Sequence, residues 1–123
     1  MKDVFVSHAT EDEAVAAEVC GLLERRGIAC WIAPRDVAPG GVWDEAVLDA
    51  IEAAPAFLLI LSSRANASLF VKNEVNRAFS QDKSIFTFRV EDVLPGRSLE
   101  LYLARHHWID GFPPPLEPKV DRA

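Results

Sequence analysis

The six residues AFLLIL, numbers 56–61, are apolar without interruption. A strand with one face in water alternates apolar and polar residues, whereas a run that is apolar on both faces is typical of a parallel sheet buried between two layers of helices. Runs of the same kind occur at DVFVS (3–7), IACWI (28–32) and SIFTF (84–88), with HHWI (106–109) as a weaker fifth. These runs predict a parallel sheet of four to five strands.

The connections between the runs place apolar residues at helical spacing. They do so in the first connection at Val15, Val19, Leu22 and Leu23, and in the second at Val47, Leu48, Ile51 and Ala54. Right-handed crossovers put the helices of such a chain on both faces of the sheet. The expected fold class is therefore α/β, a doubly wound parallel sheet with strand order 2-1-3-4-5.

Two local signals mark the ends of the first helix. Thr10 followed by Glu13 has the form of a capping box, with Thr10 at the N-cap and Glu13 at the third helical position. Gly27 suits the position just beyond the helix, where a left-handed backbone is common. The sequence therefore predicts where this helix begins and ends.

The chain has 123 residues, half of them hydrophobic, which suits one domain with a single core. The last 13 residues, GFPPPLEPKVDRA, contain four prolines, which are excluded from helix and sheet interiors. We therefore expect a domain at residues 1–110 and a proline-rich linker at 111–123, leading to a further C-terminal domain.

Charge and hydropathy exclude several classes of protein. The net charge of −6 opposes binding to nucleic-acid phosphates, which needs clustered Lys and Arg. No segment approaches the apolar length of a membrane span, so we expect no membrane contact and a cytoplasmic location. Three scattered histidines and two cysteines offer no metal-ligand spacing, so no metal is expected. Cys20, Cys30, Trp31 and Trp108 are interpreted as packing residues.

A ligand crevice is expected beyond the carboxyl ends of the strands, between strands one and three. That places Ser7, His8 and Ala9 at its rim, together with the Ser-Ser-Arg sequence at 62–64. Neither a P-loop nor a Rossmann glycine motif occurs, and no acidic residue ends strand three as a phosphorylated receiver domain would need. Common phosphate-binding sites are therefore disfavoured.

The segment SLFVKNEVNRAF (68–79) contains one residue that departs from its pattern. As a helix it carries an apolar stripe of Val71, Val75, Ala78 and Phe79, and Glu74 falls on the same side. Burying an unpaired carboxylate costs several kcal/mol. Glu74 is therefore expected either to have a structural partner or to face a ligand crevice.

Four segments in this order resemble a Toll/interleukin-1 receptor (TIR) domain of the bacterial type. They are DVFVSHATEDE (3–13), CWIAPRDVAPGGVW (30–43), FLLILSSRANAS (57–68) and FVKNEV (70–75). The resemblance extends over roughly residues 2 to 110. It implies a flavodoxin-like fold and identifies residues 33–42 as the loop that this family calls the BB loop.

The resemblance also implies an activity. Members of the family either hydrolyse NAD between nicotinamide and ribose or act as scaffolds through TIR–TIR contacts. The enzymes carry a glutamate four residues beyond an aromatic residue that is usually tryptophan. Glu74 matches the glutamate, and Phe70 holds the aromatic position. NAD is then a substrate, no cofactor is expected, and the product is ADP-ribose or a cyclic ADP-ribose together with nicotinamide.

One carboxylate suffices for this chemistry. Nicotinamide departs as a good, neutral leaving group while positive charge develops on the ribose, and Glu74 can stabilise that charge. An O-glycosidase needs a second, protonated carboxyl group for its poorer leaving group. The lack of an obvious paired acid therefore does not oppose the assignment.

Four further residues are candidates for substrate binding, each with a structural alternative. Ser7 can hydrogen-bond a ribose or phosphate, or simply cap a turn, and His8 can line the nicotinamide end or be a solvated rim residue. Arg35 can pair with the pyrophosphate, or the Arg35–Asp36 pair can be an internal loop contact or a subunit surface. Trp43 is either a ligand platform or a core residue. Phe70 is the stronger stacking candidate.

The family resemblance further implies activation by head-to-tail assembly through the loop at 33–42. It also implies a role as the NAD-hydrolase effector domain of a larger bacterial immune or antiphage protein, one with a C-terminal sensor domain. Two alternatives remain open at this stage. One is a non-catalytic TIR scaffold, and the other is a nucleotide-binding protein without turnover.

Overall fold

A computed structural model describes residues 2–40, 43–103 and 107–112. It contains a parallel sheet of β1 (Val4–Ser7), β2 (Cys30–Ile32), β3 (Ala56–Leu61), β4 (Ser84–Arg89) and β5 (Trp108–Asp110), in the order β2-β1-β3-β4-β5. The predicted fold class, the parallel direction and the strand order are confirmed. Of the weaker fifth run, residue 106 lies outside the described residues.

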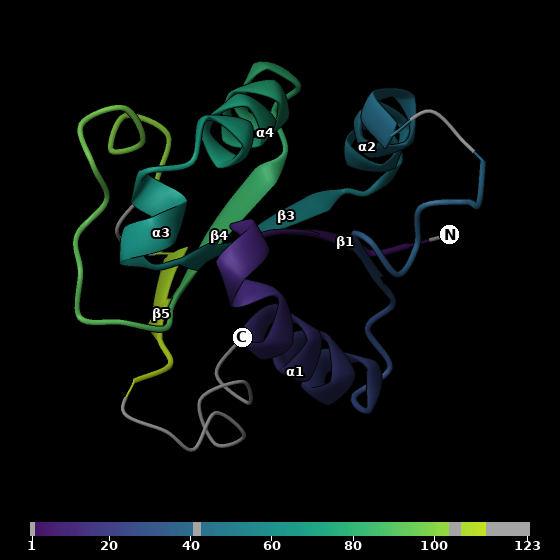
Figure 1. The fold of residues 1–123 in the computed structure, drawn as a ribbon, viewed down its shortest axis with the longest axis horizontal. Coiled ribbons are helices and arrows are strands. Elements are labelled where there is room, and N and C mark those ends of the chain that lie inside the picture. The colour runs from purple at the N-terminus through teal and green to yellow at the C-terminus, as the bar shows by residue number, and fades with distance from the viewer. Residues whose placement is uncertain (1, 41–42, 104–106, 113–123) are drawn as a thin grey trace.

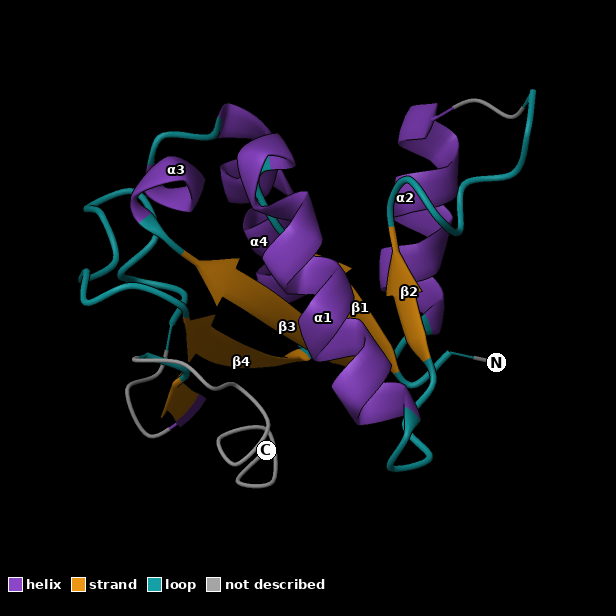
Figure 2. Ribbon diagram, turned by 60° about the horizontal axis from the view of Figure 1, so that its bottom comes forward, coloured by secondary structure: helices purple, strands orange, loops and turns teal. Residues whose placement is uncertain are grey.

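Helices cover both faces of the sheet (Figures 1 and 2). Helix α1 (Glu13–Glu24) packs on one face, and α2 (Trp43–Ala53), α3 (Ser63–Asn66) and α4 (Leu69–Ser80) pack on the other. Adjacent residues of a strand point to opposite faces. In β1, Phe5 accordingly joins the cluster under α2 and α4, while Val6 joins the cluster under α1.

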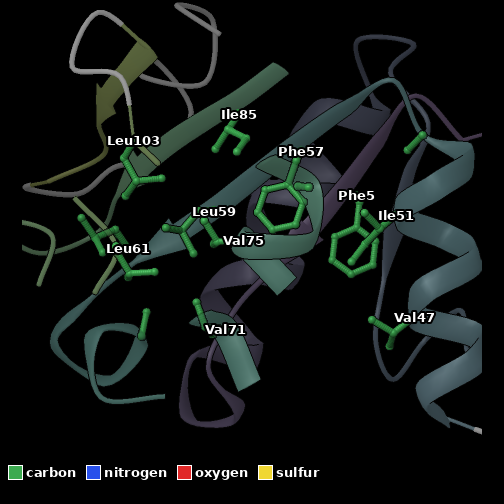
Figure 3. Close-up of a cluster of buried hydrophobic side chains, with 14 residues drawn as sticks. Phe5, Val47, Ile51, Phe57, Leu59, Leu61, Val71, Val75, Ile85 and Leu103 are labelled. Atoms are coloured by element: carbon green, nitrogen blue, oxygen red, sulfur yellow. The ribbon is translucent and has the colours of Figure 1, made fainter. Parts of the chain in front are cut away.

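The core on the α2 and α4 side contains an aromatic stack (Figure 3). The ring of Phe5 stacks on Trp31 at 5.2 Å and on Phe57 at 5.4 Å between centroids. Trp31 is therefore a packing residue, as predicted. Cys20 and Cys30 are buried free thiols in the cluster on the opposite face, which confirms their packing assignment.

Of the predictions for the two ends of α1, one is confirmed and the other is wrong. Gly27 has a φ of 83°, its N–H binds the Glu24 carbonyl, and the Ile28 N–H binds the Leu23 carbonyl, which is the Schellman pattern. The predicted place of Gly27 just beyond the helix is confirmed. The predicted capping box at Thr10 and Glu13 is wrong. Thr10 instead begins a 3-10 helix, η1 (Thr10–Asp12), and neither helix start has a side-chain cap.

Side-chain caps start the two helices after β3. The Ser62 hydroxyl accepts a hydrogen bond from the Ala65 N–H, and the Ser68 hydroxyl accepts one from the Val71 N–H. Ser68 is thus the N-cap of α4.

The predicted apolar faces hold with two exceptions. Val71, Val75 and Ala78 are fully buried, but Phe79 is half-exposed and packs edge-on against Tyr102. Leu48 of α2 is also partly exposed, at 40%. Both lie at the margin of their helical stripe, where neighbouring segments decide burial.

The remaining organisational predictions are only partly covered by the structure. Positions 41–42 of the predicted assembly loop and 113–123 of the predicted linker lie outside the described residues. Within the described part of the chain, no helix is both long and apolar enough to cross a membrane.

Candidate functional site

The carboxyl group of Glu74 lies inside the protein, between α4 and β1. Its residue is only 7% exposed, and the Ser7 hydroxyl donates a hydrogen bond to Oε1 at 2.6 Å. The geometry follows from both elements. The helical period turns Glu74 toward the sheet with Val71 and Val75, and the strand period puts Ser7 on the same face as Phe5. The sequence-derived expectation that Glu74 points inward is therefore confirmed.

The environment of Glu74 favours its neutral form. Burial raises the pKa of Glu74 from the ordinary 4.5 to about 8, and the hydrogen bond from Ser7 acts in the opposite direction. With one hydrogen-bond donor and little contact with solvent, the negative charge of the ionised Glu74 carboxylate would be poorly stabilised. A positively charged group placed beside it would therefore be bound strongly and would favour its ionisation.

Glu74 reaches a cavity of about 180 Å³ at the carboxyl ends of β1 and β2, which we call the strand-end pocket. It is lined by Phe5, Val6, His8, Thr10, Glu13, Ala33, Pro34, Trp43, Phe70 and Glu74. Segments from across the fold contribute to it: β1 and the connection after it, the start of α1, the loop after β2, the start of α2 and the first turns of α4. The pocket therefore exists only in the folded chain.

The structure brings together four of the predicted site residues in this pocket: Glu74, His8, Trp43 and Phe70. Trp43 and Phe70 are 42% and 44% exposed, so part of each aromatic residue is open to solvent. Trp43 is not a core residue. Ser7 lies behind the pocket wall, fully buried, and acts on the site through its hydrogen bond to Glu74.

His8 connects the pocket to the loop after β2. Its Nδ1 lies 2.8 Å from the Ala9 carbonyl oxygen, and its Nε2 lies 2.9 Å from the Ala33 carbonyl oxygen. Since Ala33 begins the predicted assembly loop, His8 ties the end of β1 to that loop as well as lining the pocket.

Arg35 lies outside the strand-end pocket. Its guanidinium donates to the Glu24 carboxylate at 2.9 and 3.0 Å, to Asp36 and to the Cys30 carbonyl. The hydrogen bond from Arg35 holds the pKa of Glu24 below its ordinary value. These contacts favour the alternative that the Arg35–Asp36 pair is an internal loop contact.

The serines after β3 also lie elsewhere. Ser62 is fully buried, and its hydroxyl binds the Asp12 carboxylate, while Arg64 lies 3.6 Å from the same carboxylate. The Ser63 hydroxyl binds Glu91. None of the three is among the residues that line the strand-end pocket.

Six lining residues were not among the predicted site residues: Phe5, Val6, Thr10, Glu13, Ala33 and Pro34. The available signal was topological. Segments that follow β1 and β2 meet at one edge of a parallel sheet, so residues just after each strand were candidates. Glu13 was instead assigned to a capping box that does not form.

A second cavity, of about 260 Å³, lies between α2 and α4 and shares Phe70 and Glu74 with the first. Its other lining residues are Asp44, Val47, Leu48, Ile51, Asn73 and Arg77. We call it the interhelical groove. Phe70 stands at the border of the two cavities.

Comparison with known proteins agrees with the fold. The TIR domain family matches residues 4–121. The structure resembles the TIR domain of the Toll-related receptor TRR-2 from Hydra magnipapillata, with a TM-score of 0.80, 23% identity and coverage of 99% of this chain and 94% of that one. No curated protein matches the sequence.

Two further solved structures share the fold. The TIR domains of the activated Roq1 resistosome have a TM-score of 0.66 at 15% identity, with 74% of this chain and 58% of that chain covered. The Clostridium botulinum CMP N-glycosidase BcmB has a TM-score of 0.63 at 17% identity, with 98% and 97% covered. The chain belongs to the TIR domain family, which includes NAD-cleaving enzymes and proteins that assemble through TIR–TIR contacts.

Proposed function

We propose that this domain hydrolyses NAD at the bond between nicotinamide and ribose, with Glu74 as the catalytic residue. The observation that carries the proposal is a buried carboxylate, held by a single hydroxyl, that opens into an aromatic-lined pocket at the carboxyl ends of β1 and β2. The fold of an N-glycosidase, BcmB, adds support for this class of reaction.

The chemistry uses the charge of the substrate. The nicotinamide ring of NAD is a pyridinium cation, and its positive charge next to Glu74 favours the ionised carboxylate despite the raised pKa. As the bond breaks, the electron pair leaves with the ring, which becomes neutral nicotinamide, and the cation moves to the ribose. Glu74 stabilises that ribosyl cation. Water then adds and releases one proton, which gives ADP-ribose.

The aromatic side chains have a separate role. Phe70 and Trp43 offer partly exposed rings on which the planar nicotinamide can pack. A phenylalanine at position 70 provides the stacking face but not the N–H of the tryptophan that is usual in the family enzymes. The loop at 33–42 borders the pocket through Ala33 and Pro34, so assembly through this loop would alter the site directly.

The test is NAD consumption and nicotinamide release over a range of protein concentrations, including domains crowded on a surface. Wild type is compared with Glu74→Gln and Glu74→Ala, with Glu18→Gln as the matched control, because Glu18 is an exposed carboxylate on α1, outside both cavities. We expect turnover in wild type and Glu18→Gln, rising with density, and a loss of at least about 100-fold in the Glu74 variants.

Two results would contradict the proposal. No nicotinamide release at any density would favour the scaffold function, with Glu74 serving only as the partner of Ser7. Tight NAD binding in calorimetry without turnover would indicate a nucleotide-binding protein.

A further inference from the structure

The interhelical groove and the strand-end pocket are neighbouring cavities that share part of their walls. Phe70 and Glu74 line both. Their volumes are about 180 and 260 Å³, each below the range of about 300–1,000 Å³ typical of small-molecule sites, which the two reach together. A dinucleotide therefore needs both cavities.

The charges of the lining residues distinguish the two halves of the site. The strand-end pocket contains the carboxylates of Glu13 and Glu74 and no Lys or Arg among its described lining residues, so it suits a cation. In the groove, Arg77 is already paired with Glu52 at 2.8 Å, and Asp44 and Glu74 are acidic. A phosphate is disfavoured in the groove, and a neutral group is favoured.

The walls and rim of the groove suit a purine nucleoside. Val47 and Ile51 project from the side of α2 that faces Phe5 (Figure 3), and the side chains of Leu48 and Phe70 are partly exposed, so these four form an apolar slot. Asn73 lies beside the slot with an amide, which can both donate to and accept from an adenine edge. Asp44 adds a carboxylate, an acceptor for ribose hydroxyls.

We propose that the interhelical groove binds the adenosine half of NAD, with Asn73 as the residue that recognises adenine, Asp44 as the acceptor for the ribose hydroxyls and Phe70 as the divider between the two halves. The inference rests on the proposed function for the location of the nicotinamide half. The cationic ring then occupies the strand-end pocket, and the pyrophosphate passes around the partly exposed Phe70 in contact with solvent.

The kinetic test compares NAD with nicotinamide mononucleotide, which contains the same scissile bond and lacks the adenosine half. Asn73→Ala is expected to lower kcat/KM for NAD by about tenfold, the loss of one base contact, and to leave kcat/KM for the mononucleotide unchanged. Asn76→Ala is the matched control, since Asn76 lies one turn along α4, outside the groove, where its amide binds the Tyr102 hydroxyl. An equal loss with both substrates would overturn the proposal.

A second measurement does not depend on turnover. AMP is titrated into the Glu74→Gln variant while backbone amide NMR shifts are followed. We expect shifts at Asp44, Leu48 and Asn73 that Asn73→Ala weakens. The adenosine subsite is refuted if AMP leaves these residues unchanged, or if they shift with protein concentration alone, which would place a second copy in the groove. Failure of NAD hydrolysis with these AMP shifts present would overturn the proposed function and leave the subsite standing.

Discussion

Replacing Glu74 by Gln keeps the shape of the side chain and removes its ionisation, so the substitution measures what the buried charge costs the fold. In the folded state the pKa of Glu74 is about 8, against an ordinary 4.5, chiefly because burial disfavours the charged form. Below pH 4.5 Glu74 is protonated in both the folded and the unfolded state, and its burial does not lower the free energy of unfolding. As pH rises from 4.5 to 8, the unfolded state ionises first and the free energy of unfolding falls. At 1.36 kcal/mol per pH unit between the two values, the full cost is about 5 kcal/mol.

The assay is urea unfolding of wild type and Glu74→Gln at pH values from 4.5 to 9. We expect the free energy of unfolding of the variant, minus that of wild type, to increase by up to about 1.4 kcal/mol per pH unit between pH 4.5 and 8 and then to level off. Glu18→Gln, which removes an exposed carboxylate, is expected to show no such rise. A difference in the free energy of unfolding between wild type and Glu74→Gln that is the same at all pH values would refute the reasoning. A protein that loses activity and gains stability through one substitution would show that the charge is retained for function.

Three further predictions follow from individual contacts. Ser7→Ala removes the hydroxyl that donates to Glu74 and is expected to raise the pKa of Glu74 further. Because catalysis needs the ionised carboxylate, the pH at which kcat/KM increases is expected to move upward by about 1–2 units; an unchanged pH profile would contradict this. Arg35→Ala is expected to lower the free energy of unfolding by about 1 kcal/mol, since its ion pairs are partly exposed, and to leave KM for NAD unchanged; a large rise in KM would restore its predicted substrate role. Gly111→Ala is expected to destabilise by about 1–3 kcal/mol in thermal unfolding, because its Cβ would lie 2.2 Å from Cε1 of Phe88; equal stability would show that the Phe88 ring can move.

Features determined by local pattern were predictable from the sequence. Uninterrupted apolar runs such as residues 56–61 indicate a strand buried on both faces, and connections long enough for a helix make such strands parallel. The handedness of these connections then restricts the strand order. Gly27 ends α1 because a left-handed backbone favours glycine. The inward direction of Glu74 followed from helical period alone.

The details of the site depended on residues far apart in the chain. Thr10 and Glu13 match a capping box locally, yet Asp12 is buried against Ser62, 50 residues away, and the chain forms a 3-10 turn there instead. Arg35 was chemically suited to a phosphate, but the carboxylate of Glu24 on α1 lies close enough to bind it.

The sequence by itself determined the sheet, its order and the helix face that carries a carboxylate, because these depend on the polarity and spacing of neighbouring residues. Only the tertiary structure decided that Ser7 would be the hydrogen-bond partner of Glu74, that Trp43 and Phe70 would border one cavity, and that a second cavity would lie beside it between α2 and α4. Those contacts join elements up to 67 residues apart, and their distances are set by how whole helices pack on the sheet.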